Sequence, residues 1–211
     1  MMLAWHFLSD DKRLGYDDGR LVEVDVPLEC EGEPVLCNNG MHGSVRLIDA
    51  LKYASGPIVC RVEIEGDVIE GENKLCGHRR TVLWMLDATQ ILHEFACQCA
   101  EDALALVAEP DPRSVAAIAA KRQWLRGEIA DEELAASRAA AWAAAETAAE
   151  AAAWAAARAD AWAAADAAAR AAACAAARAA ARNAECAAAI AKYDARLTEM
   201  VIEAREKEET K

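Results

Sequence analysis

The residues of this sequence best suited to chemistry form a short basic cluster, His78, Arg79 and Arg80, in a domain rich in Asp and Glu. Neighbouring guanidinium groups bind phosphate or carboxylate groups through paired, charge-assisted hydrogen bonds. Arg79 and Arg80 are therefore candidates for an anion-binding site. The alternative is that both arginines neutralise nearby carboxylates of the same domain.

The eight cysteines contain no Cys-x-x-Cys pair, the spacing typical of zinc sites and redox motifs. A zinc site built from Cys30, Cys37, His42 and Cys76 is conceivable, but these residues lack the two close ligand pairs of most four-ligand sites. We expect reduced cysteines that act as small apolar side chains, and no bound metal.

Alanine dominates the segment from Asp131 to Lys211, which contains neither glycine nor proline. Because alanine has the highest helix propensity, this segment predicts a single helix on the order of 110 Å long. Larger residues recur every four positions from Arg138 to Ile190. In a helix this spacing winds a row of side chains slowly around the axis, which predicts contacts on several sides.

Exposed tryptophans in this helix would each forgo roughly 1.5 to 3 kcal/mol of burial free energy. We therefore expect a homo-oligomer assembled through residues 131–211, closed near its end by a heptad-like seam. The side chains expected at the interface are Trp142, Trp154, Trp162, Ile190, Leu197 and Val201. The alternative is a monomeric spacer helix, which alanine propensity alone would permit.

Residues 1–109 have the pattern of a small α+β domain. Alternating apolar and polar residues predict strands, most clearly over 21–26 and 58–64. A short helix is expected to end before Gly56, and a second helix begins after Asp87.

Residues 110–130 are expected to form a linker and an amphipathic helix that ends at Gly127. Residues 131–211 then form the long helix. The expected fold is therefore a small α+β domain followed by a helical hairpin and a very long alanine-rich helix in a coiled coil or bundle.

The formal net charge is −13. An acidic surface repels phosphate backbones, so we expect no nucleic-acid partner. No stretch is apolar enough to span a bilayer, and the first residues lack the pattern of a signal peptide. We therefore expect a cytoplasmic protein without a membrane partner.

Residues 40–69 contain a Gly-Met-His-Gly-Ser turn, a helix ending in Tyr-Ala, a Gly-Pro and an Arg-Val-Glu strand followed by Gly-Asp-Val. This pattern resembles a family of small bacterial and bacteriophage proteins of uncharacterised function, whose members often end in alanine, tryptophan and arginine repeats. The resemblance implies a phage or prophage setting in a bacterial host cell. It implies no particular activity.

A second resemblance concerns His6, His42 and Tyr53, whose order along the chain is similar to that in ADP-ribosyltransferase-like folds. This resemblance implies that His6 and His42 would hold the ribose and amide groups of NAD, and that Tyr53 would stack on the nicotinamide. The sequence departs from the pattern because His6 is followed by Phe-Leu rather than Gly-Ser or Gly-Thr. It also lacks a convincingly placed glutamate for the ribose hydroxyl.

The preferred hypothesis is a non-enzymatic, self-associating structural or interaction protein without a cofactor. It would display its small acidic domain on a helical oligomer, as an inhibitor or decoy for a host protein or as part of a filament. The alternative hypothesis is a protein that binds or processes NAD through His6, His42 and Tyr53.

Overall fold

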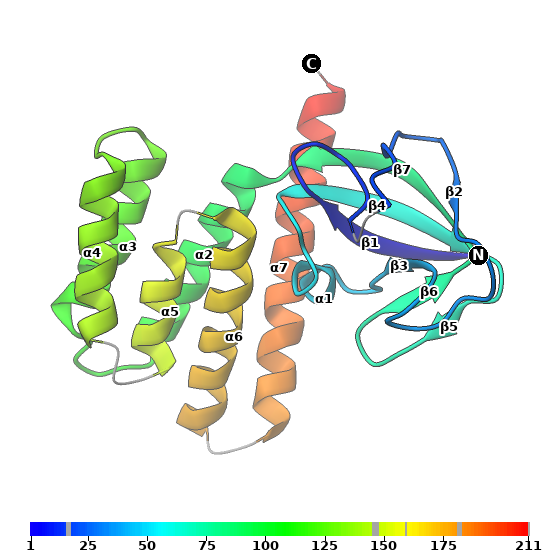
Figure 1. Ribbon diagram of the computed structural model, residues 1–211. Helices are drawn as coiled ribbons and strands as arrows, with labels where there is room; N and C mark the ends of the chain where they lie inside the picture. Colours follow the sequence, from blue (N-terminus) through cyan, green and yellow to red (C-terminus); the bar gives the residue numbers. More distant parts are fainter. Residues whose placement is uncertain (16–17, 145–147, 159, 181–182, 211) are drawn as a thin grey trace. The chain divides into compact units, whose positions relative to one another are not determined.

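The computed structural model describes residues 1–15, 18–144, 148–158, 160–180 and 183–210. The chain divides into two units, one formed by residues 1–88 together with residues from 204 onward and the other by residues 89–203. The sheets belong to the first unit, and the second consists of helices (Figure 1).

The first unit contains β1 (Met2–Leu8), β2 (Leu28–Glu29), β3 (Met41–Gly43), α1 (Leu47–Leu51), β4 (Ile58–Glu65), β5 (Ile69–Glu70), β6 (Leu75–Gly77) and β7 (Arg79–Asp87). Four strands form an antiparallel sheet in the order β1-β4-β7-β2, and three form a second sheet in the order β3-β6-β5. A bridge between Trp5 and Ser44 connects β1 to the segment after β3. The strand predicted over 58–64 is confirmed as β4.

Side chains alternate between the two faces of the four-stranded sheet, because successive residues of a strand point in opposite directions. One face carries the main apolar core of the unit: Ala4, Leu8, Ile58, Cys60, Val62, Ile64 and Val82, packed with Val22 and Leu75. The other face carries Trp5 and Trp84, whose rings meet edge to face with centroids 5.7 Å apart. The guanidinium of Arg61 lies 4.6 Å from the centre of the Trp5 ring.

Residues 21–26 do not form the continuous strand that their alternation predicts. They make single bridges at Leu21 and Val24, and Asp25 has a φ of 61°. This left-handed conformation, which short polar side chains tolerate, interrupts the extended backbone. Val22 is nevertheless buried in the core, as the pattern requires.

The second unit contains α2 (Thr89–Leu104), α3 (Pro112–Leu125), α4 (Asp131–Ala144), α5 (Ala148–Ala156) and α6 (Ala161–Ala180), and residues of α7 (Asn183–Glu209) fall in both units. Helix α2, which the sequence analysis assigned to the domain of residues 1–109, clusters with these helices. It packs against α3, α5 and α6, and α3 packs against α4. Its buried face includes Leu92, Phe95 and Cys99.

The predicted single helix over residues 131–211 was wrong, and so was the fold class that depended on it. The structure divides this segment into α4, α5, α6 and α7, of which α7 has 27 residues. Asp160 directly precedes α6. Asp is a residue type that favours helix N-termini, because its side chain accepts hydrogen bonds from free backbone N–H groups.

Alanine faces of these helices pack within one chain. Helix α6 buries alanines at a spacing of three or four residues, and it packs against α2 and α5. The buried alanines of α6 are Ala161, Ala164, Ala165, Ala168, Ala169, Ala172, Ala173 and Ala175. Short side chains allow this close approach between helices, so the protein itself covers a surface that the sequence assigned to an oligomer. Self-association stays a prediction.

A buried lysine stabilises the chain where α5 has ended. Lys121 is fully buried, and its Nζ donates a hydrogen bond of 2.7 Å to the carbonyl oxygen of Arg158. The Nζ also lies 3.8 Å from the centre of the Trp124 ring. Carbonyl groups beyond a helix C-terminus lack helical partners and attract a positive charge. Burial lowers the pKa of Lys121 to about 8.

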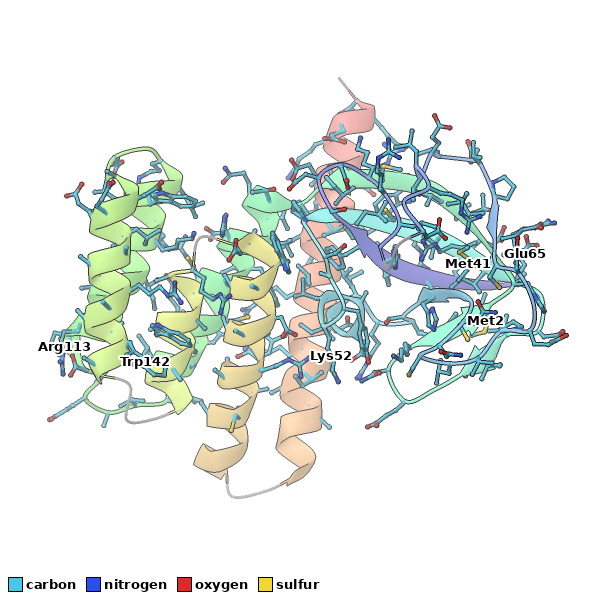
Figure 2. The ribbon with its side chains drawn as sticks, in the orientation of Figure 1. Met2, Met41, Lys52, Glu65, Arg113 and Trp142 are labelled. Atoms are coloured by element: carbon cyan, nitrogen blue, oxygen red, sulfur yellow. The ribbon has the colours of Figure 1, made fainter. Side chains whose placement is uncertain are left out.

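The residues expected at an oligomer interface have different environments. Trp142, near the end of α4 (Figure 2), is 62% exposed. Its ring centre lies 4.6 Å from that of Trp154. Trp162 and Ile190 are half-buried, whereas Leu197 and Val201 are buried. The side chains of Glu146, Glu150, Arg178, Arg182 and Cys186, which belong to the repeat, lie outside the described residues. No helix in the described part of the chain is both long and apolar enough to cross a membrane.

Candidate anion-binding site

Arg79 and Arg80 are neighbours in β7 and therefore point to opposite faces of the sheet. Arg79 is exposed, and the strand register places it between Glu29 of β2 and Glu65 of β4. Its guanidinium lies 2.7 Å from a carboxylate oxygen of Glu29 and 3.8 Å from one of Glu65. Arg79 thus neutralises carboxylates, as the alternative interpretation of the sequence expected.

Arg80 is only 4% exposed and lies on the core side of the sheet. Its Nη1 donates a hydrogen bond of 2.8 Å to the carbonyl oxygen of His42. Among the described residues Arg80 forms no ion pair, and the carboxylate of Asp18, which influences its pKa, is bound by Arg20 at 2.7 Å. Burial lowers the pKa of Arg80 to about 10, so the guanidinium stays charged at neutral pH. Within the described part of the chain, the site therefore holds a buried cation without an ion-pair partner.

His6 lies near this cation. It projects from β1 opposite Cys60 of β4, on the same face as Arg80. Burial, and then the charges of Arg80 and His42, hold the pKa of His6 well below its usual value. His6 is therefore a neutral hydrogen-bonding group at pH 7.

His42 of β3 is held by backbone groups. Its Nε2 accepts a hydrogen bond of 3.2 Å from the N–H of Cys37, which places the ring proton on Nδ1. Burial lowers the pKa of His42, and the charges of Lys74 and Arg80 act in the same direction. The side chain of His42 is thus fixed and neutral, and the backbone carbonyl of His42 orients Arg80.

Cys60 does not supply the missing negative charge. The residue is fully buried, and burial raises the pKa of its thiol to about 12 in spite of the nearby Arg80. A thiol with this pKa is protonated at neutral pH. The cluster of His6, His42, Cys60 and Arg80 consequently has a net positive charge in an acidic protein.

Tyr53 lies apart from the hydrogen bonds of this cluster. Its ring is 45% exposed, and its hydroxyl donates to Oδ1 of Asn73 at 2.7 Å. The Nζ of Lys74 lies 4.6 Å from the ring centre. Lys74 is a neighbour of both Tyr53 and the Arg80 cluster, because it contacts the Tyr53 ring and its charge lowers the pKa of His42.

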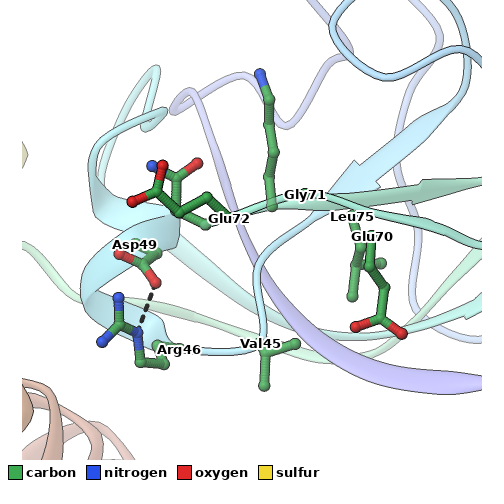
Figure 3. A pocket seen from close by; sticks show the side chains of 9 residues that line it. Val45, Arg46, Asp49, Glu70, Gly71, Glu72 and Leu75 are labelled. Atoms are coloured by element: carbon green, nitrogen blue, oxygen red, sulfur yellow. Dashed lines mark hydrogen bonds and ion pairs between the residues drawn. The ribbon is translucent and has the colours of Figure 1, made fainter.

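Asn73 and Lys74 also line a small pocket of about 240 Å³ beside α1 (Figure 3). The remaining lining residues are Val45, Arg46, Asp49, Glu70, Gly71, Glu72 and Leu75. Nε of Arg46 donates to the carboxylate of Asp49 at 2.6 Å. Because carboxylates predominate among the charged groups, the pocket is less suited to an anion than the surroundings of Arg80.

A family model described as a domain of unknown function (DUF7666) matches residues 2–94. No curated protein and no solved structure matches the chain. The match agrees with a resemblance to an uncharacterised family, and it assigns no activity.

The matched span contains every residue that the sequence suggested for ligand binding: His6, His42, Tyr53, Arg79 and Arg80. The structure brings three of them together, His6, His42 and Arg80. In the sequence, Arg79 and Arg80 form one pair of candidate anion ligands. The segment Arg-Arg-Thr-Val-Leu-Trp has the pattern of a strand, in which adjacent residues face opposite sides of the sheet. This pattern predicts that Arg79 and Arg80 do not share one site.

Proposed function

We propose that the first unit is a non-catalytic binding domain for a small anion that carries a phosphate or carboxylate group. The proposal rests on the buried Arg80 guanidinium, which has no ion-pair partner among the described residues. Burying a charge costs several kcal/mol unless it is paired. An incoming anion would supply the partner, and the planar guanidinium is suited to hold phosphate or carboxylate oxygens through two parallel hydrogen bonds.

His6 and His42 support the same proposal. Both are neutral near neutral pH, because burial and the charge of Arg80 lower each pKa. Neutral imidazoles add hydrogen-bonding capacity without a competing positive charge. NAD, which carries two phosphates and is implied by the second resemblance, belongs to this ligand class. The proposed function includes it as one candidate ligand.

Arg80→Met is expected to weaken anion binding by about tenfold or more, because a hydrogen bond to a charged group contributes about 1.5–3 kcal/mol. Calorimetric titration of the full chain with phosphate, pyrophosphate and NAD measures this. Arg79→Met is the matched control and should keep the affinity of the natural chain. The proposal fails if no anion binds at millimolar concentration, or if both variants lose affinity equally.

Arg80→Met also has an expected effect on stability that separates binding from folding. Removing a buried, unpaired charge should leave the free energy of unfolding unchanged or raise it. Urea denaturation therefore checks that a loss of binding is not a loss of structure. A variant with both lower stability and lower affinity would indicate that Arg80 has a structural role.

We also propose, as a second function, that the helical unit self-associates and displays the anion-binding domain in several copies. The supporting observation is the 62% exposure of Trp142, whose ring centre lies 4.6 Å from that of Trp154, with the two ring planes tilted by 49°. Exposed aromatic rings are frequent anchors of interfaces. This proposal includes three further points: the protein is encoded by a phage or prophage, it acts in the cytoplasm of a bacterial host, and its target is a host protein.

Trp142→Ala is expected to raise the dissociation constant of the oligomer by more than about 30-fold, because central interface residues contribute about 2 kcal/mol or more. Sedimentation equilibrium of the full chain measures the change. Val115→Ala removes another exposed apolar side chain, 48% exposed, and serves as the control. A natural chain that stays strictly monomeric at micromolar concentration rules out self-association.

A further inference from the structure

Three metal-binding side chains of the first unit converge outside the anion-binding cluster. They are Glu33, Asp67 and His78, and their ligand atoms all lie within 4.8 Å of one another. Nε2 of His78 lies 3.6 Å from Oδ2 of Asp67 and 3.9 Å from Oε2 of Glu33. The three residues come from separate segments: the one after β2, the turn between β4 and β5, and the position between β6 and β7.

The distances from Nε2 of His78 to the two carboxylate oxygens suit ligands of one bound ion better than direct hydrogen bonds. Both exceed the length of a normal hydrogen bond between nitrogen and oxygen, about 2.7–3.2 Å. Two ligands at about 2.0–2.2 Å from one metal ion are at most about 4.4 Å apart. The two observed distances from His78, 3.6 and 3.9 Å, lie within that limit, and the ligand oxygens of Glu33 and Asp67 lie within 4.8 Å of each other.

The two carboxylates lack the basic partners that other acidic groups of this unit have. Among the described residues, Glu33 and Asp67 form no ion pair with lysine or arginine, whereas Glu29 is bound by Arg79. Both carboxylates are 86% exposed, so an ion from solution can reach them. A divalent cation would neutralise their two charges.

His78 is held in place by its surroundings. Its carbonyl oxygen accepts a hydrogen bond of 2.9 Å from the N–H of Cys30. Its side chain packs against Gly66, whose φ is 72° and where an added Cβ would lie 2.9 Å from Cβ of His78. The absence of a side chain at position 66 thus allows the imidazole to lie beside the turn that carries Asp67.

We propose that Glu33, Asp67 and His78 bind a divalent transition-metal ion of the series from Mn²⁺ to Zn²⁺. An imidazole ligand together with carboxylates favours these ions over Ca²⁺ and Mg²⁺, which prefer oxygen ligands alone. Three protein ligands leave at least one coordination position for water or an anion. The surface location sets this site apart from the buried cluster around Arg80.

Calorimetric titration of the EDTA-treated full chain with Zn²⁺ tests the proposal, with a phosphine as the reductant. We expect one ion per chain, and at least about tenfold weaker binding in His78→Ala and Asp67→Asn, because even the loss of a group that only orients a ligand costs 10–100-fold. Asp10→Asn, which alters an exposed carboxylate elsewhere, should bind as the natural chain does. Circular dichroism verifies that each variant is folded.

The competing explanation for Zn²⁺ binding is that the ion binds to cysteine thiols, because Cys30 is partly accessible and Cys37 is exposed. A Cys30→Ser, Cys37→Ser double variant should keep its Zn²⁺ affinity. Binding that disappears in this variant and persists in His78→Ala overturns the proposal, as does a natural chain that binds no Zn²⁺.

Discussion

Phe95→Ala is expected to lower the free energy of unfolding of the helical unit by about 3–5 kcal/mol. Phe95 is fully buried in α2, the helix that packs against α3, α5 and α6. Its ring meets Tyr193 of α7 edge to face, with the centroids 6.3 Å apart. Truncation removes a large apolar side chain and leaves a cavity. The alanine faces of α5 and α6 cannot fill that cavity, because their side chains are short.

Urea denaturation followed by circular dichroism at the helical band measures this loss. Phe95→Leu keeps most of the apolar volume and should be destabilised much less. Leu106→Ala, at a site that is 49% exposed, should change the stability little. A Phe95→Ala variant as stable as the Leu106→Ala variant would show that α2 is not central to the packing.

Acidification from pH 6.5 to pH 4 is expected to destabilise the helical unit through His93. His93 is 2% exposed, and its Nδ1 has no hydrogen-bond partner among the described residues. Burial, with a further contribution from the charge of Lys121, lowers the pKa of His93 to about 4. The folded state therefore keeps this imidazole neutral at pH values where the unfolded chain protonates it.

The direction of the effect follows from the protons bound by each state. Above pH 6.5 neither state binds this proton, so the stability contributed by the neutral His93 is fully present. Between pH 6.5 and pH 4 the unfolded state binds the proton and the folded state does not, which favours unfolding. The loss amounts to on the order of 3 kcal/mol by pH 4.

Denaturation curves at a series of pH values measure this loss in the natural chain and in His93→Gln. The difference between the two proteins isolates His93 from His6, whose pKa is also lowered. We expect the stability of the natural chain to fall more steeply with acid than that of the variant. Parallel pH profiles would contradict the assignment.

Local patterns predicted part of the first unit correctly. The alternation over residues 58–64 predicted β4, because a strand with one buried face needs apolar residues at every second position. The same reasoning failed over residues 21–26, where the left-handed backbone of Asp25 interrupts the strand. The alternation depends on the apolar positions alone, and a single left-handed residue between them leaves it unchanged.

The sequence identified the types of residue in the candidate site, but it did not show which of them lie together. His6, His42 and Arg80 are far apart in the sequence, and the pairing of β1 with β4 and of β4 with β7 places His6 and Arg80 on one face. His93 of α2 is 2% exposed. Lys121 and Trp124 of α3 lie against it: the charge of Lys121 lowers its pKa, and its ring centre is 5.4 Å from that of Trp124.

The sequence alone predicted helix in the alanine-rich segment, where the structure has α4, α5, α6 and α7, because alanine favours the helix at nearly every position. It also determined the acidic character of the chain and the basic cluster at residues 78–80. Tertiary structure decided where the alanine-rich segment breaks and what it packs against. The physical reason is that propensity is a local free energy, whereas the ends and partners of a helix depend on distant groups such as Lys121.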